Sequence, residues 1–168
     1  MRRQQECVLR RLRSRAGIPM KKLVIENSLL VPEIVKLTNQ GLNVTFTAKG
    51  NSMIPFIYGG RDSVLLAKPV EVNVNDVVLA AIGDGKYVLH RVIRVEGNRI
   101  VLMGDGNIVG CEYCEEKDVL AVAVAVIRNG ICYECNGRAY LFWVKLWRVL
   151  LPVRRCILPV LKRINKVN

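Results

Sequence analysis

A serine and a histidine are the residues in this chain that could together hydrolyse an amide bond. Ser52 lies in a turn rich in Gly and Pro that follows a short β-prone run, residues 44–47. Gly50 allows backbone angles that other residues resist, and Pro55 fixes φ and ends strand pairing. We therefore expect the hydroxyl of Ser52 to project from a rigid strand-to-turn junction. A turn serine without a chemical role is the alternative, because serine is common in turns.

His90 is the only histidine in the sequence. Imidazole titrates near about pH 6.5, so it can take the proton of an attacking serine hydroxyl and later return it to the leaving amine. The run 87–95 has the composition of a strand, and alternation along it places His90 on the same face as Val88 and Val92. A histidine without a chemical role is again the alternative. Together, Ser52 and His90 predict a serine nucleophile with a histidine general base.

A series of short motifs surrounds these two residues. In chain order they are Gly50-Asn51-Ser52-Met53-Ile54-Pro55, Asp62-Ser63-Val64, Asn75-Asp76-Val77-Val78, His90-Arg91-Val92 and Gly104-Asp105-Gly106-Asn107. Over residues 44–128 this series resembles the signal peptidase I and SOS-repressor (LexA-like) superfamily of serine peptidases. Histidine in place of lysine at the base position is similar to the archaeal and endoplasmic-reticulum signal peptidases. The resemblance implies a mainly β, coiled fold and an active serine peptidase.

A third group usually orients the imidazole of such a pair. Asp105 matches the Gly-Asp-Asn turn of the superfamily and is our first choice for this role. In the histidine-type relatives the acid stands six residues later, where this chain has Cys111, followed by Glu112. Glu112 and a Ser–His dyad without an acid therefore stay open, as does a purely turn-forming Asp105.

The neighbours of the serine are expected to contact substrate. We assign substrate binding to Gly50, Asn51 and Met53, and the oxyanion donor to the backbone N–H of Ser52. Bacterial signal peptidases place a hydroxyl two residues before the nucleophile, where this chain has Gly50. The resemblance also implies an extended substrate with small residues at the first and third positions before the cut.

The charge of the chain is concentrated at its two ends. The 168 residues carry a net charge of +12, with eight Lys or Arg and one acid in residues 1–22, and eight and none in 138–168. This distribution predicts a basic N-terminal tail (1–22), a peptidase-like domain (23–137) and a basic C-terminal segment (138–168). The basic ends favour an anionic partner. Nucleic acid is the partner that we expect least.

Helices are expected at both ends of the β region. Residues 28–40 have helical spacing of apolar positions, with Gly41 suited to end the helix. From residue 44 to about 134, short apolar runs alternate with turns, such as Asn129-Gly130, which is typical of a hairpin. Residues 139–168 form a basic amphipathic pattern that Pro152 and Pro159 should split. Arg154 alone departs from the basic face. In-plane membrane binding and docking on the sheet are the alternatives for the apolar face.

Four of the six cysteines form two C-x2-C pairs, Cys111/Cys114 and Cys132/Cys135. This spacing is typical of a zinc ribbon. However, strand alternation would point Cys132 and Cys135 to opposite faces. We therefore expect free thiols and no cofactor or metal, with structural zinc or a disulfide as the alternatives.

Neither a signal peptide nor an apolar run of membrane-spanning length is visible in the sequence. The expected location is the cytoplasm, at the cytosolic face of a membrane if the C-terminal segment binds lipid. The expected function is a serine endopeptidase that cleaves a peptide or protein precursor. Self-cleavage at Ala16-Gly17, a catalytically inactive binding module, and a zinc-ribbon nucleic-acid binder are the alternatives.

Overall fold

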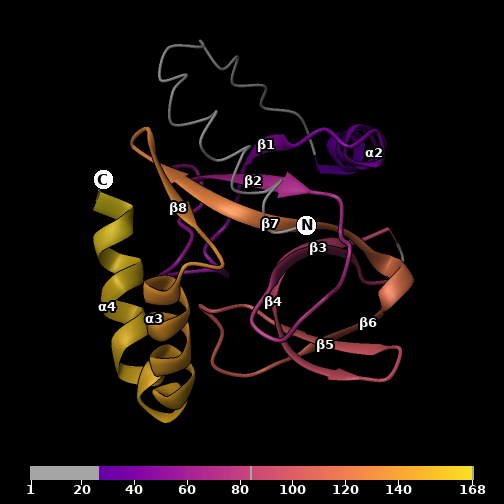
Figure 1. Ribbon diagram of the computed structural model, residues 1–168. Coiled ribbons are helices and arrows are strands. Elements are labelled where there is room, and N and C mark those ends of the chain that lie inside the picture. Colours follow the sequence, from indigo (N-terminus) through magenta and orange to yellow (C-terminus); the bar gives the residue numbers. More distant parts are fainter. Residues whose placement is uncertain (1–26, 84, 168) are drawn as a thin grey trace.

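The computed structural model describes residues 27–83 and 85–167. Within these residues, eight strands form one curled antiparallel sheet, with one α-helix before it and two α-helices after it (Figure 1). The predicted fold class is therefore confirmed: mainly β and coiled, with an N-terminal helix and a C-terminal helical segment. The basic tail predicted for residues 1–22 lies outside the described residues.

The strands lie between the turns that the sequence predicts. They are β1 (Val44–Thr47), β2 (Ser63–Ala67), β3 (Val77–Ala81), β4 (Tyr87–Glu96), β5 (Arg99–Met103), β6 (Glu112–Glu115), β7 (Val119–Arg128) and β8 (Ile131–Glu134). Their order in the sheet is β1-β2-β7-β3-β4-β5-β6, and β8 also pairs with β7. Asn129 and Gly130 both have positive φ, which is what a tight hairpin between β7 and β8 requires.

Strand β7 joins the two halves of the sheet. Its first residues pair with β3, its central residues pair with β2, and its end pairs with β8. Buried and half-buried residues alternate along most of its length, so one row of side chains faces the core. Because β7 pairs with both β2 and β3, it connects the strand that follows the Ser52 turn with the hairpin that carries His90.

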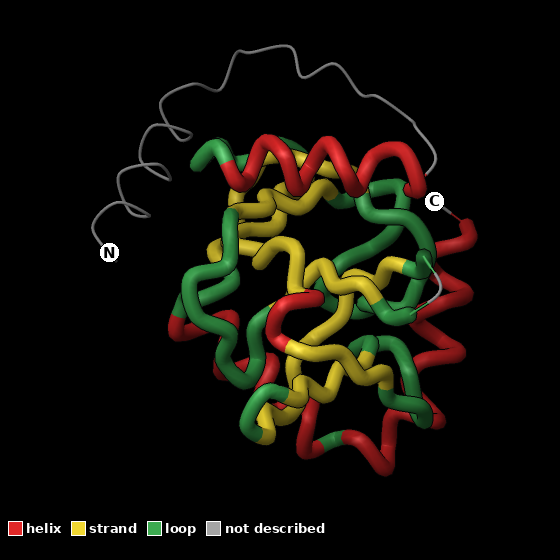
Figure 2. The backbone as a smooth tube through the Cα atoms, turned by 90° about the vertical axis from the view of Figure 1, so that its right-hand side faces the viewer, coloured by secondary structure: helices red, strands yellow, loops and turns green. Residues whose placement is uncertain are grey.

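Helix α2 (Asn27–Asn39) covers one end of the sheet (Figure 2). Val31 and Ile34 are buried against β1, β2 and β7. The hydroxyl of Thr38 donates a hydrogen bond to the carbonyl oxygen of Ile34. Gly41, with φ of +79°, ends the helix in a conformation that favours glycine. The predicted helix over 28–40 is thus present and packs on the sheet.

The C-terminal segment forms α3 (Arg138–Val149), a short 3-10 turn η2 (Leu151–Val153) and α4 (Arg154–Val167), on the other side of the molecule from α2 (Figure 1). Pro152 lies in the break, as predicted. The prediction that Pro159 splits the segment is wrong, because α4 continues through it. Pro159 removes one helical hydrogen bond, but Ile157, Leu158 and Leu161 pack the helix against its neighbours.

One face of these helices docks on the peptidase-like domain. Trp147 and Leu158 are buried against Ile54, which belongs to the Ser52 turn. The indole N–H of Trp147 also donates to the carbonyl oxygen of Asp105 at 2.9 Å. No helix within 27–83 and 85–167 is long and apolar enough to cross a membrane.

Truncating Leu158 tests this docking. Leu158 is 1% exposed, whereas Val160, two residues later on the same helix, is 57% exposed. We expect Leu158→Ala to lower the free energy of unfolding by about 2–5 kcal/mol, because it leaves a cavity under α4. Val160→Ala should change it by less than about 0.5 kcal/mol. Urea unfolding monitored by circular dichroism measures both, and equal small effects would show that α4 does not dock.

Candidate active site

The turn that carries Ser52 is held tightly on both sides. The backbone N–H groups of Phe56 and Ile57 both donate to the carbonyl oxygen of Met53. Gly50 adopts a positive φ of +78°. A Cβ on Gly59 would lie 2.0 Å from the carbonyl oxygen of Gly50, so the two ends of the turn meet where only glycine fits. Ser52 therefore sits on a rigid junction, as the sequence predicts.

The Gly104-Asp105-Gly106-Asn107 turn packs directly beneath Ser52. The N–H of Gly106 donates to the carbonyl oxygen of Ser52 at 2.7 Å. A Cβ on Gly104 would lie 2.5 Å from that same oxygen and 3.1 Å from Nε2 of His90. Only a residue without a side chain fits at Gly104, and its backbone is in contact with both predicted catalytic residues. The tertiary structure thus brings the serine turn and the histidine together around this glycine.

His90 lies on β4 and is 6% exposed. Its Nδ1 is 3.0 Å from Oε2 of Glu112, the first residue of β6. An ionised carboxylate only accepts hydrogen bonds, so it holds the proton on Nδ1. Nε2 is then the ring nitrogen with a free lone pair, and it is the nitrogen beside Gly104 and the Ser52 turn. This arrangement corresponds to the acid–histidine half of a catalytic triad.

The expectation that Asp105 orients His90 needs a correction. Both carboxylate oxygens of Asp105 accept hydrogen bonds from Arg91, at 2.7–3.1 Å, and both residues are buried. Burial alone would lower the pKa of Arg91, but the adjacent Asp105 carboxylate raises this pKa above its usual value. Asp105 therefore forms a buried ion pair with Arg91. Of the acids that the sequence left open for this role, Glu112 is the one within hydrogen-bonding distance of His90.

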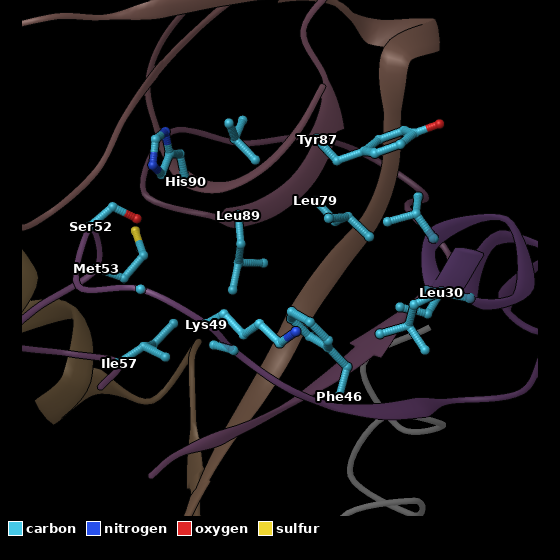
Figure 3. Close-up of a pocket in the computed structure, with 15 residues that line it drawn as sticks. Leu30, Phe46, Lys49, Ser52, Met53, Ile57, Leu79, Tyr87, Leu89 and His90 are labelled. Atoms are coloured by element: carbon cyan, nitrogen blue, oxygen red, sulfur yellow. The ribbon is translucent and has the colours of Figure 1, made fainter. Parts of the chain in front are cut away.

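A cavity of about 140 Å³ opens beside Ser52 and His90. The two residues lie at one end of it, and Leu30 of α2 and Tyr87 of β4 lie at the other (Figure 3). Its other lining residues are mostly apolar: Val31, Ile34, Phe46, Ala48, Lys49, Gly50, Met53, Ile57, Leu79, Val88 and Leu89. Of the predicted substrate contacts, Gly50 and Met53 line the cavity. Asn51 does not, because its backbone faces Gly106 beneath the turn.

The cysteine pairs lie on strands that do not pair with each other. Cys114 is on β6, at the end of the strand order, and Cys132 is on β8. Across the described ranges, no three or more His, Cys, Asp or Glu side chains are grouped as metal ligands. Burial raises the pKa of the thiols of Cys114 to about 11 and Cys135 to about 12, so neither is an activated, low-pKa thiol.

Sequence reasoning missed two parts of this site. It predicted the helix over residues 28–40 but did not foresee that Leu30 and Val31 of this helix would line the cavity. It also left Arg91 without a role, although this residue directly follows the predicted base. The available signal was strand alternation, which places the side chain after His90 on the opposite face of β4.

Comparison with known proteins agrees with this geometry. No curated protein matches the chain. A family model described as Peptidase S24-like matches residues 12–126, more than half of the chain and the whole region from the serine turn to β7. The chain therefore belongs to the Peptidase S24-like family.

Proposed function

We propose that this chain is a serine endopeptidase that cleaves a peptide or protein precursor. Ser52 is the nucleophile, His90 the general base, and Glu112 a positioning residue that fixes the imidazole. The observation that carries the proposal is the arrangement of Glu112, His90 and Ser52: Glu112 contacts the imidazole of His90, and His90 lines the same cavity as Ser52. One acid holds Nδ1 of His90, and Nε2 and Ser52 border the same cavity. Membership of the Peptidase S24-like family supports the reaction class.

The proposed chemistry follows from these positions. The hydroxyl of Ser52 attacks the scissile carbonyl carbon and passes its proton to Nε2 of His90. The carboxylate of Glu112 would stabilise the imidazolium that forms. His90 then donates the proton to the leaving amine, which gives an acyl-serine that water hydrolyses by the same route. Within the described residues the N–H of Ser52 has no hydrogen-bond partner, so it is available as an oxyanion donor.

The size and lining of the cavity favour a substrate with a small side chain next to the scissile bond. Its volume of about 140 Å³ and its largely apolar lining suit a small aliphatic group more than a charged or aromatic one. Met53 and Ile57 are buried in its floor and leave little room to widen it. We therefore keep the preference for small residues before the cut as part of the proposal.

Cleavage of a mixed peptide library tests the reaction. We expect Ser52→Ala and His90→Ala each to reduce cleavage by at least about 10³-fold, because they remove the nucleophile and the base. Circular dichroism should show an unchanged fold. Mass spectrometry of the products gives the cut sites in the wild type.

Other outcomes of that experiment point to the alternatives. Equal product patterns from all three proteins would indicate that the chain is a binding or regulatory module and not a peptidase. Cleavage of the chain alone, at Ala16-Gly17, would make it a self-cleaving regulator; this bond lies outside the described residues. Loss of the self-cut in Ser52→Ala would still assign the nucleophile.

Glu112→Gln distinguishes the two acids. We expect it to lower kcat by about 10²–10⁴-fold with little change in Tm, because it removes the charge that stabilises the imidazolium. Asp105→Asn should instead lower stability by roughly 3–5 kcal/mol, because it leaves buried Arg91 without its counter-charge. Glu116→Gln, an exposed neighbour, is the matched control. If Asp105→Asn lowered kcat at full stability while Glu112→Gln had no effect, the assignment would be reversed.

We further propose that the enzyme acts at an anionic membrane surface, at the cytosolic face. On α3, Phe142 and Trp143 are 63% and 59% exposed, and Leu146 and Val149 are exposed beside them. This face is separate from the docked face that holds Trp147. Residues 138–168 carry eight Lys or Arg and no acid, a charge that complements anionic headgroups.

Vesicle binding tests the membrane proposal. Wild type should sediment with phosphatidylglycerol vesicles, and the double variant Phe142→Ser/Trp143→Ser should bind at least about 10-fold less, since it removes the two exposed aromatic side chains of α3. Val70→Ser is the control, because Val70 is 71% exposed but lies outside the C-terminal helices. Equal binding by the double variant, or a dimer that the double variant abolishes, would contradict a lipid partner.

A further inference from the structure

A second cavity lies behind the active site. It has a volume of about 190 Å³, and three arginines from different elements line it: Arg91 of β4, Arg148 of α3 and Arg154 of α4. Asp105 is the only acidic residue in its lining, and the other lining residues are Ile93, Met103, Gly104 and Leu151. Consecutive strand residues point to opposite faces, so His90 borders the catalytic cavity and Arg91 borders this one.

The charges in this cavity do not balance. Arg91 is paired with Asp105. Arg148 donates only to neutral oxygens, the side-chain oxygen of Asn75 and the carbonyl of Ile93. Arg154 donates only to the carbonyl oxygens of Trp147 and Asp105. In the part of the chain that the structure describes, no carboxylate forms a salt bridge with either residue, so two positive charges remain uncompensated.

Arg154 makes this imbalance costly. It is 3% exposed, and a buried charge ordinarily has a charged partner. Burial lowers the pKa of Arg154 below its usual value, and the neighbouring Arg91 and Arg148 lower it further, although Asp105 opposes them. Arg154 is also the one basic residue that falls on the apolar side of the C-terminal helical pattern. That position places its guanidinium in this cavity, beside Arg91 and Arg148.

The cavity also has hydrogen-bond donors to spare. A guanidinium has five N–H groups in a fixed fork. The bonds of Arg148 involve only its two terminal nitrogens, with Nε unused, and each terminal nitrogen of Arg154 makes a single bond. Forked N–H pairs of this kind match the oxygens of phosphate and carboxylate groups.

We propose that this cavity binds a tetrahedral oxyanion, either inorganic phosphate or the phosphoryl group of a larger ligand. A doubly charged phosphate would balance the two uncompensated arginines. Because Arg154 and Trp147 both donate to the carbonyl oxygen of Asp105, the anion would draw the C-terminal helices onto the turn beneath Ser52. The site is thus a link between an anionic ligand and the rigidity of the catalytic turn.

Phosphate binding to the Ser52→Ala protein tests this site independently of peptidase activity. At a phosphate concentration of about 100 times its Kd, Tm should rise by roughly 5 °C or more over chloride at equal ionic strength. Arg148→Gln should weaken phosphate affinity in calorimetry about 10-fold or more, because a charge-assisted hydrogen bond is lost. Arg148 is half-buried, so this variant is expected to fold. Arg155→Gln, on the exposed side of α4, is the matched control and should bind phosphate as the parent does.

Binding to vesicles matched in surface charge distinguishes a phosphoryl group on a lipid headgroup from one on a soluble ligand. A preference for phosphatidic acid over phosphatidylglycerol that Arg148→Gln abolishes would identify a lipid headgroup. Binding of free phosphate without such a preference would identify a soluble ligand. Equal effects of chloride and phosphate, or equal losses in Arg148→Gln and Arg155→Gln, would overturn the proposal.

Discussion

The hydrogen bond from the N–H of Gly106 to the carbonyl oxygen of Ser52 joins two turns on which the rest of the site depends. One turn carries the predicted nucleophile. The other carries Gly104, whose lack of a side chain lets it lie against Nε2 of His90. The two turns pack tightly, since the backbone of the serine turn occupies the space that a side chain on Gly104 or Gly106 would need. Backbone packing therefore positions the serine, and the histidine is held by this packing together with its hydrogen bond to Glu112.

Strand β4 presents consecutive side chains to two different sides of the sheet. His90 faces the apolar cavity, and Arg91, the next residue, faces Asp105 and the C-terminal helices. A buried ion pair such as Arg91–Asp105 is weak evidence for net stability, because desolvation offsets much of its attraction. Its geometric effect is clearer, since three hydrogen bonds between the two side chains hold the Gly104–Asn107 turn against β4. The C-terminal helices add to this support through Trp147 and Arg154.

The same helices present two different faces. Trp147 and Leu158 pack on Ile54 of the serine turn, while Phe142 and Trp143 remain exposed. The sequence pattern showed one apolar side and left docking and membrane binding as alternatives. The structure separates the apolar residues into two groups, and only the docked group has a partner within the described residues. A protein ligand, a lipid surface or an oxyanion that acts on these helices would therefore act close to the serine turn.

The sequence by itself determined the local features: the strands and their turns, the helix before them, and the junction at Ser52. These follow from alternation, glycine and proline positions and β-branched residues, which act over a few neighbours. Only the tertiary structure decided which acid meets His90. Asp105 and Glu112 lie seven residues apart and both are carboxylates, so composition cannot separate them, whereas the pairing of β5 with β6 carries Glu112 to the imidazole and the curl of the sheet turns Asp105 toward Arg91. The burial of Arg154 was decided in the same way, because the cavity around it is built from β4, α3 and α4 and exists only once these distant segments pack together.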